Sequence, residues 1–262
     1  MKSLAITELI HEAAALLLQS NQAVALTGAG ISTPSGIPDF RSQDSGLWRR
    51  FDPMAVASLA AFRYQPETFF EWVRPLVASM LSAVPNPAHT SLARLEEAGL
   101  ISGVVTQNID DLHHRAGSKT VFEVHGHLRR ATCIQCYRSY STEGHIETFA
   151  ECGEIPRCDD CDGILKPDIV LFGEQLPVEI VSSAQKLIDE SDLILITGSS
   201  LEVTPAASMP VRSLNRGARL IIVNMDPTYL DERADVLIHA DVVDVLPQLA
   251  DELLNKKRGG AD

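Results

Sequence analysis

The sequence predicts an α/β protein in which helices cover both faces of a parallel sheet. Short apolar runs suited to buried strands alternate with segments of helical periodicity along the 262 residues. Polar residues gather directly after the carboxyl ends of these runs, at 28–33, 107–110, 125, 198–200 and 224. Because ligands bind at that edge of an open α/β sheet, we expect a ligand site there.

The first part of the chain provides one strand and a helical insertion. An amphipathic pattern at 4–20 predicts a helix, and the apolar run at about 23–27 predicts a buried strand. Residues of about 42–83 have the pattern of a helical insertion, in which Pro53 and Pro66 can each start a helix. This insertion separates the first strand from the rest of the sheet.

The remaining elements alternate along the chain. Asn86 and Pro87 are a good N-cap and N1 pair for a helix that runs through Glu97 and is closed by Gly99. A closing helix is expected near 244–255. The further strands are expected at Ile101–Thr106, Thr120–Val124, Ser191–Thr197, Arg219–Val223 and Asp235–Ile238.

Gly28 and Gly30 follow the first strand and begin like a dinucleotide-binding turn. Glycine lets the backbone turn tightly and approach a pyrophosphate closely. Thr33 stands where the ordinary fingerprint has its third glycine, and Pro34 and Pro38 keep the chain from continuing as a long helix. The loop ends in an acid, an aromatic ring and a cation, which are Asp39, Phe40 and Arg41.

This glycine loop does not fit a dehydrogenase. Such enzymes need a second strand and an acid about 20 residues further on to bind the ribose, whereas the next convincing strand starts near Ile101. Phe40 can cover a flat ring, and the guanidinium of Arg41 can pair with phosphate. The stretch is therefore a nucleotide site of a different plan, with a plain turn as the alternative.

All five cysteines lie in one segment and predict a metal site. Cys133 and Cys136 form one knuckle, and Cys158 and Cys161 form another, so that four soft ligands suit tetrahedral zinc. Four cysteines leave no open coordination position, so the zinc is expected to be structural. Two alternatives remain: a redox pair, which lacks a strand–Cys-x-x-Cys–helix context, and a site in which Cys152 replaces one ligand.

His125 differs from the other histidines because it follows an apolar strand and precedes Gly126. A neutral imidazole at the ligand-binding edge of the sheet can serve as a general base near pH 7. Asn108 and Asp110 come from a neighbouring strand end, which favours a shared site. Their alternative role is to cap the helix that follows.

The bulk composition limits the partners of the chain. A net charge of −13 argues against non-specific nucleic-acid binding and is compatible with basic protein substrates. The N-terminus lacks the apolar region of a signal peptide, and no apolar run approaches the roughly 20 residues that span a bilayer. We expect a cytoplasmic protein that binds neither nucleic acid nor membrane, and a monomer, since nothing in the sequence demands assembly.

These residues resemble the sirtuins, which are NAD-dependent protein lysine deacylases. The matching segments follow the family order and are 28–41, Thr106–Asp110, His125-Gly126, the two cysteine knuckles, Lys166–Glu174, Gly198–Leu201 and Val223-Asn224. The resemblance implies a Rossmann-like domain formed by 1–128 and 166–262, with a small inserted zinc-ribbon module at 129–165. It also implies that NAD is consumed as a co-substrate and that an acyl-lysine protein or peptide meets it in the cleft between the two parts.

The resemblance assigns roles to individual residues. It makes His125 the catalytic base, while Asn108 positions a ribose hydroxyl or a water. The peptide clamp falls on Val170, Phe172 and Gly173 on one side and on Glu202 and Val203 on the other. The positions that contact the cofactor are Gly28, Ala29, Gly30, Thr33, Pro38, Asp39, Phe40, Arg41, Gln107, Asn108, Ile109, Asp110, His125, Gly198, Ser199, Ser200, Asn224, Met225, Asp241 and Val242.

The implied reaction transfers the acyl group of acyl-lysine to ADP-ribose and releases nicotinamide and O-acetyl-ADP-ribose. Family members that remove succinyl or malonyl groups carry a Tyr-x-x-Arg pair after the glycine loop, whereas no tyrosine occurs here between Tyr64 and Tyr137. We therefore expect an uncharged acyl group, acetyl first. The alternatives are other uncharged acyl groups, a protein ADP-ribosyltransferase at the same site, and a non-catalytic NAD sensor or zinc-dependent adaptor.

Overall fold

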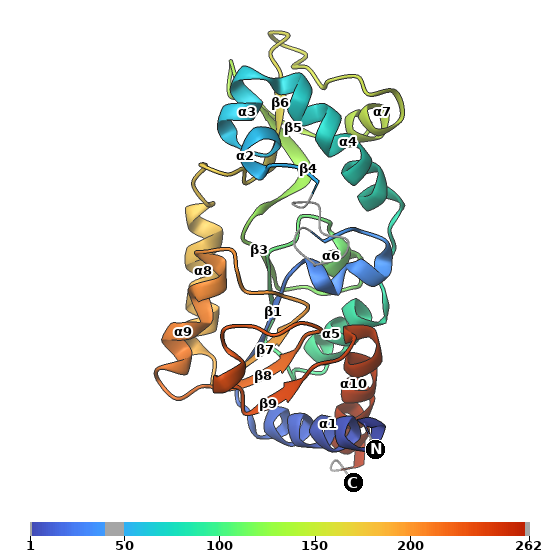
Figure 1. The fold of residues 1–262 in the computed structure, drawn as a ribbon, viewed down its shortest axis with the longest axis vertical. Helices are drawn as coiled ribbons and strands as arrows, with labels where there is room; N and C mark the ends of the chain where they lie inside the picture. The colour runs from blue at the N-terminus through green and yellow to red at the C-terminus, as the bar shows by residue number, and fades with distance from the viewer. Residues whose placement is uncertain (1, 40–49, 260–262) are drawn as a thin grey trace.

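A six-stranded parallel sheet forms the centre of the larger part of the molecule (Figure 1). The structure is a computed structural model that describes residues 2–39 and 50–259. The strand order is β3-β2-β1-β7-β8-β9. Because the chain leaves β1 toward β3 and later returns to β7 on the other side of β1, the order reverses between β1 and β7. The strands are β1 Ala23–Thr27, β2 Val104–Thr106, β3 Val121–Glu123, β7 Leu193–Thr197, β8 Arg219–Val223 and β9 Val236–Ile238.

Helices cover both faces of this sheet, as the sequence predicts. Alternate residues of a strand point to opposite faces: Ala25 packs in one apolar cluster with three helices, whereas Val24 and Leu26 pack in another with two. On the first face lie α1 Lys2–Gln19, α5 Pro87–Glu97 and α10 Val242–Gly259. On the second lie α8 Val178–Glu190 and α9 Met209–Leu214, which are additional to the predicted helices.

A second, antiparallel sheet has the order β5-β4-β6 and carries the cysteine knuckles. Its strands are β4 Gly126–Cys133, β5 Ser139–Ser141 and β6 Leu165–Ile169, with α7 His145–Cys152 between β5 and β6. These four elements were not predicted individually. Most β4 side chains are only partly buried or exposed, so this strand lacks the continuous apolar run that marks the large sheet.

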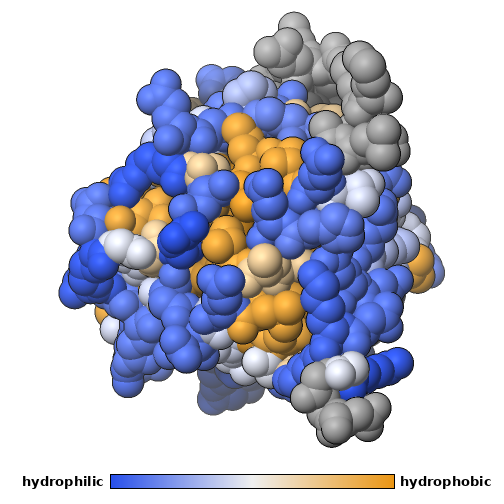
Figure 2. All heavy atoms as spheres, turned by 90° about the horizontal axis from the view of Figure 1, so that it is seen from below, coloured by the Kyte–Doolittle hydropathy of each residue, from blue (hydrophilic) through white to orange (hydrophobic). Residues whose placement is uncertain are grey.

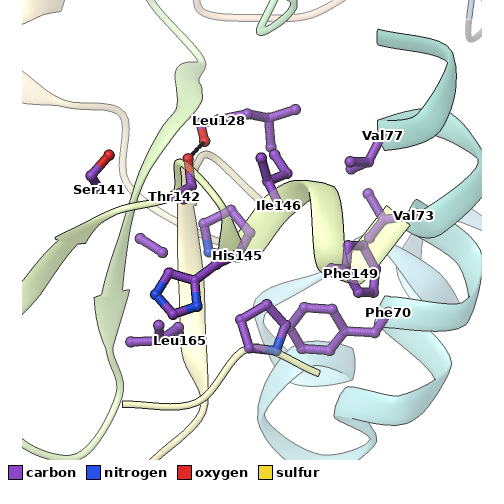
Figure 3. Close-up of a pocket in the computed structure, with 13 residues that line it drawn as sticks. Phe70, Val73, Val77, Leu128, Ser141, Thr142, His145, Ile146, Phe149 and Leu165 are labelled. Carbon is purple, nitrogen blue, oxygen red and sulfur yellow. Dashed lines mark hydrogen bonds between the residues drawn. The ribbon is translucent and has the colours of Figure 1, made fainter. Parts of the chain in front are cut away.

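The helical insertion packs against this second sheet. It contains α2 Pro53–Val56, α3 Leu59–Tyr64 and α4 Pro66–Ser82, so helices start at Pro53 and Pro66 as predicted. The rings of Phe70 and Phe149 meet edge to face at 5.3 Å, joining α4 to α7. A cavity of about 30 Å³ lies between α4, α7 and the sheet, and its apolar lining shows that the three share one core (Figure 3).

The surface is mainly hydrophilic on the face that carries the two termini, with apolar side chains showing between the charged ones (Figure 2). Apolar atoms exposed in this way are ordinary for a folded protein. No helix within residues 2–39 and 50–259 is both long and apolar enough to cross a membrane.

Candidate active site

The loops that follow β1 and β7 touch backbone to backbone. A Cβ atom on Gly30 would lie 2.9 Å from the carbonyl oxygen of Gly198, and one on Gly198 would lie 2.3 Å from the nitrogen of Ile31. Gly198 also has a φ of +60°, which disfavours a side chain. These glycines are therefore required for the contact between the two loops at the switch point of the sheet.

Two short 3₁₀ turns, Ala29–Ile31 and Thr33–Ser35, replace the long helix of a dinucleotide fold. Thr33 donates its hydroxyl proton to the carbonyl of Gly30 at 3.1 Å. The loop is thus ordered without a third glycine, as predicted. Pro38 and Asp39 are the last residues described before the gap, and Phe40 and Arg41 lie outside the described residues.

Ser32 is the centre of a buried hydrogen-bond network. Its hydroxyl donates to Asp110 Oδ2 at 2.6 Å and accepts from Asn108 Nδ2 at 3.0 Å. His89 Nε2 lies 3.3 Å from the same oxygen. The N–H of Asn86 donates to His89 Nδ1, so Nε2 carries the proton and donates to Ser32. Ser32 therefore uses its one donor and both acceptor positions.

Neither Ser32 nor His89 was predicted as a site residue. His89 was interpreted only as part of a helix start, and it does complete a capping box with Asn86 there. Its other ring nitrogen, Nε2, donates to Ser32 in the candidate site. Burial lowers the pKa of His89 to about 4, so the ring is neutral near pH 7, as this hydrogen-bond pattern requires.

Asp110 is a buried carboxyl group at the end of β2, with 7% of its surface exposed. Burial raises its pKa, hydrogen bonds from Ser32 and the Leu112 N–H lower it, and the nearby carboxylates of Glu123 and Asp111 raise it. The net direction is upward. A carboxyl group with a raised pKa among polar partners at a sheet edge is typical of a functional site.

His125 follows β3 and is held by backbone groups on both sides. Its Nδ1 lies 3.0 Å from the carbonyl oxygen of Gln107. Since a carbonyl only accepts, Nδ1 carries the proton and Nε2 is the basic nitrogen. The N–H of Val170 donates to the carbonyl of His125 at 2.8 Å. At Gly126, where φ is +79°, a Cβ atom would lie 2.0 Å from the Asp168 carbonyl, so glycine must follow the histidine.

The residues expected at the far end of the cofactor site are spread over three loops. Gln107 donates from Nε2 to Ser199 Oγ at 3.0 Å, which connects the β2 and β7 ends. Asn224 is buried after β8 and donates from Nδ2 to the Asp226 carbonyl at 2.7 Å. Three other positions differ in exposure: Ser200 and Met225 are exposed, whereas Val242 lies in the apolar core.

The predicted peptide-binding segment follows β6. The N–H of Phe172 donates to the carbonyl of Ala57 at 3.0 Å, and the N–H of Leu59 donates to the carbonyl of Phe172 at 2.9 Å. The backbone of Phe172 is thus bonded to the helical insertion. The N–H of Gly173 donates to no backbone carbonyl of the described residues.

The four predicted zinc ligands come together at one end of the second sheet. All four sulfur atoms lie within 4.8 Å of one another, and the Cys133–Cys161 and Cys136–Cys158 sulfurs are each 3.5 Å apart. Tetrahedral zinc with bonds of about 2.3 Å needs sulfurs about 3.8 Å apart, so this donor set fits the metal. Cys152 is exposed on α7 and is not one of the four, which excludes the alternative in which it replaces a ligand.

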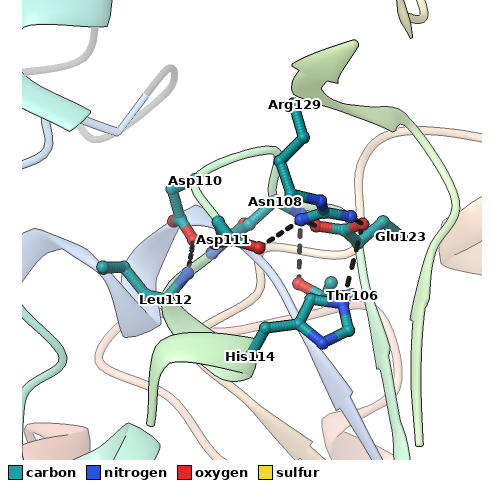
Figure 4. A network of polar contacts seen from close by, with 8 residues as sticks. All are labelled: Thr106, Asn108, Asp110, Asp111, Leu112, His114, Glu123 and Arg129. Atoms are coloured by element: carbon teal, nitrogen blue, oxygen red, sulfur yellow. Dashed lines mark hydrogen bonds and ion pairs between the residues drawn. The ribbon is translucent and has the colours of Figure 1, made fainter. Parts of the chain in front are cut away.

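An ion cluster lies beside Asp110 and was not predicted (Figure 4). Arg129, on β4, forms ion pairs with both Glu123 and Asp111. His114 Nε2 lies 3.8 Å from a carboxylate oxygen of Glu123. The cluster joins the β2, β3 and β4 segments next to the predicted site residues.

The chain is similar to known proteins over nearly its whole length. The model of the Sir2 family matches residues 28–205. The NAD-dependent protein deacylase 2 of Archaeoglobus fulgidus is 44% identical over 93% of this chain and 96% of its own. The NAD-dependent protein deacetylase of Thermotoga maritima is 43% identical over 90% and 95%.

Solved structures agree with these relatives. A Sir2 complex with a p53 peptide and NAD+ has a TM-score of 0.84 at 41% identity and covers 96% of this chain and 98% of its own. Sir2Tm bound to a propionylated peptide has a TM-score of 0.83 at 41% identity and covers 93% and 98%.

Proposed function

Because this chain belongs to the Sir2 family, we propose that it is an NAD-dependent protein-lysine deacetylase. It transfers the acetyl group of acetyl-lysine to ADP-ribose and releases nicotinamide. The observation that carries the proposal is that Asn108 and Asp110 both bond to Ser32 of the glycine loop, while His125 bonds to the carbonyl of Gln107, the residue before Asn108. The names of the relatives and the NAD+ and peptide ligands of the neighbouring structures support it.

The nicotinamide pocket is formed by Pro38, Asp39, Ile109 and Asp110. NAD, when bound, supplies a ribose carbon that becomes electrophilic as nicotinamide leaves. The carboxyl group of Asp110, fixed by Ser32 and the Leu112 N–H, holds the carboxamide of nicotinamide. The Gly28 and Gly30 backbone, with Ala29, Thr33, Ser199 and Ser200, lies along the pyrophosphate.

His125 acts as the general base. Its protonated Nδ1 is turned to the Gln107 carbonyl, so Nε2 takes the proton of a ribose hydroxyl. Asn108 donates its amide N–H to Ser32, which leaves its amide oxygen to accept from that hydroxyl or from a water. Ser32 therefore fixes Asn108 and Asp110 together.

The peptide lies between two edges, on Val170 and Gly173 and on Glu202 and Val203, by β-strand addition. Pairing falls on Gly173 rather than on the Phe172 backbone, which the helical insertion already uses. Asn224, Met225, Asp241 and the backbone of Val242 form the adenine end. The division into 1–128 with 166–262 and 129–165, the cytoplasmic location, the monomeric state and the lack of nucleic-acid or membrane partners stay predictions.

Nicotinamide release should depend strictly on an acetyl-lysine peptide. The leaving step is expected to need the acyl oxygen as nucleophile, so the protein with NAD alone should release almost none. The measurement is nicotinamide by chromatography with and without peptide, together with mass spectrometry of the product. O-acetyl-ADP-ribose supports the deacetylase, ADP-ribosylated protein indicates the transferase, and peptide-independent release indicates an NAD glycohydrolase.

Acetyl-lysine should be preferred to succinyl-lysine by about tenfold or more, since an unpaired carboxylate is costly to bury. Residues 69–76 lie where the succinyl-removing family members carry the Tyr-x-x-Arg pair. The one arginine of this stretch, Arg74, donates to the carbonyls of Ala150 and Glu151 instead. The measurement is kcat/KM on acetyl, propionyl and succinyl forms of one peptide. Propionyl is the uncharged control, and a higher kcat/KM on succinyl would refute the expectation.

A further inference from the structure

We propose that Arg129 is a positioning residue that fixes the His125 turn against the loop carrying Asn108 and Asp110. The inference rests on the function proposed above. The guanidinium of Arg129 bonds to two carboxylates, those of Glu123 and Asp111, and acts on the site through them (Figure 4). No role follows for it from the sequence motifs.

The Arg129–Glu123 pair spans the catalytic histidine. Glu123 stands two residues before His125, at the end of β3, and Arg129 stands four residues after it, on β4. The guanidinium contacts both oxygens of the Glu123 carboxylate, one of them at 3.0 Å. A two-pronged contact of this kind fixes orientation as well as distance. The pair therefore closes the turn that carries His125 and Gly126 between the two sheets.

The second contact of Arg129 holds the loop after β2, which carries Asn108 and Asp110. Asp111 directly follows Asp110 and has a φ of +64°, a left-handed conformation that non-glycine residues rarely adopt. Its carboxylate pairs with Arg129 Nη1. Arg129 thus anchors a strained residue next to Asp110 and ties it to the same guanidinium that fixes the His125 turn.

Charge balance supports the same role. The carboxylates of Asp110, Asp111 and Glu123 lie close enough for the last two to raise the pKa of the first. The Glu123 side chain is 8% exposed, so its charge needs a partner. Arg129 bonds to two of these three carboxylates, and without it their repulsion would push the Asp111 loop away from β3.

Arg129→Met tests the proposal, because methionine keeps much of the side-chain stem and removes the charge. We expect kcat to fall about tenfold and the inhibition constant of nicotinamide to rise about tenfold, since misplacement of about 1 Å is costly in a reacting site. The KM for the acetyl peptide should stay within about twofold, because the Arg129 guanidinium bonds to Glu123 and Asp111 rather than to the peptide segment after β6. Arg130→Met, an exposed neighbour on the same strand, is the matched control and should behave as wild type.

Rescue separates positioning from general stability. Glycine accepts the left-handed conformation without strain, so Asp111→Gly in the Arg129→Met background should recover part of the lost kcat. Wild-type kcat and nicotinamide inhibition in Arg129→Met, an equal loss in Arg130→Met, or no recovery in the double variant would each overturn the proposal. Nicotinamide binding, measured by calorimetry, keeps this test separate from the proposed function. If the wild-type protein does not deacetylate, the proposed function is wrong. Weaker nicotinamide binding by Arg129→Met than by the wild type would still support the positioning role of Arg129.

Discussion

Replacing His125 by alanine is expected to abolish deacetylation, with kcat falling by about 10²–10⁴-fold. The ring is oriented by the Gln107 carbonyl so that Nε2 is the basic nitrogen. Alanine removes that nitrogen and leaves the Gly126 turn intact, because the bond from the Val170 N–H goes to the backbone of residue 125. The loss should therefore appear in kcat on an acetyl-lysine peptide, while zinc content and the melting temperature stay near those of the wild type.

Two controls make the result specific. His11→Ala removes an exposed histidine that pairs with Glu252 on the far side of the molecule, and it should keep full activity. NAD binding to the His125→Ala variant should persist in calorimetry, because Asp110, Ser32 and the glycine loop are unchanged. Near-full deacetylation by that variant would contradict the assignment of His125 as the base.

The sequence could predict the large sheet because its signals are local. Each strand is an apolar run ended by polar or glycine residues, and Pro53, Pro66 and Pro87 mark helix starts in the sequence and in the structure. The Cys-x-x-Cys spacing likewise predicted the ligand set that the structure brings together. These patterns need only neighbours along the chain.

The residues that support the site needed the folded chain. Ser32 meets His89, Asn108 and Asp110 only after the loops of β1 and β2 and the start of α5 come together. Arg129 lies in a half-exposed strand that reads as polar, and nothing local pairs it with Asp111. Val242 shows the same limit: the family resemblance assigns it to the adenine end, and only the folded chain shows that its side chain lies in the core, which leaves its backbone for a ligand contact.

Removing zinc is expected to unfold the end of the second sheet that carries the cysteine knuckles. The part of this sheet that packs on the helical insertion should stay folded. The buried apolar cluster at the knuckles consists of Ala131, Cys133, Cys158 and Leu165, so two of its four members are themselves ligands. Little hydrophobic core remains there without the metal. Structural zinc contributes on the order of 10 kcal/mol in small metal modules, far more than this cluster can replace.

The loss should be local in structure and complete in activity. After chelation, hydrogen exchange should lose protection in β5 and around the two cysteine knuckles, while α7 stays packed on α4 and β1, β7 and β8 stay protected by the two helical layers. Deacetylation should stop, because β4 carries Gly126 and Arg129 and β6 leads directly into the peptide segment. Cys133→Ser should reproduce both effects and Cys152→Ser neither, since Cys152 is exposed outside the ligand set. A zinc-free protein with intact protection and activity would show that the four cysteines have another role.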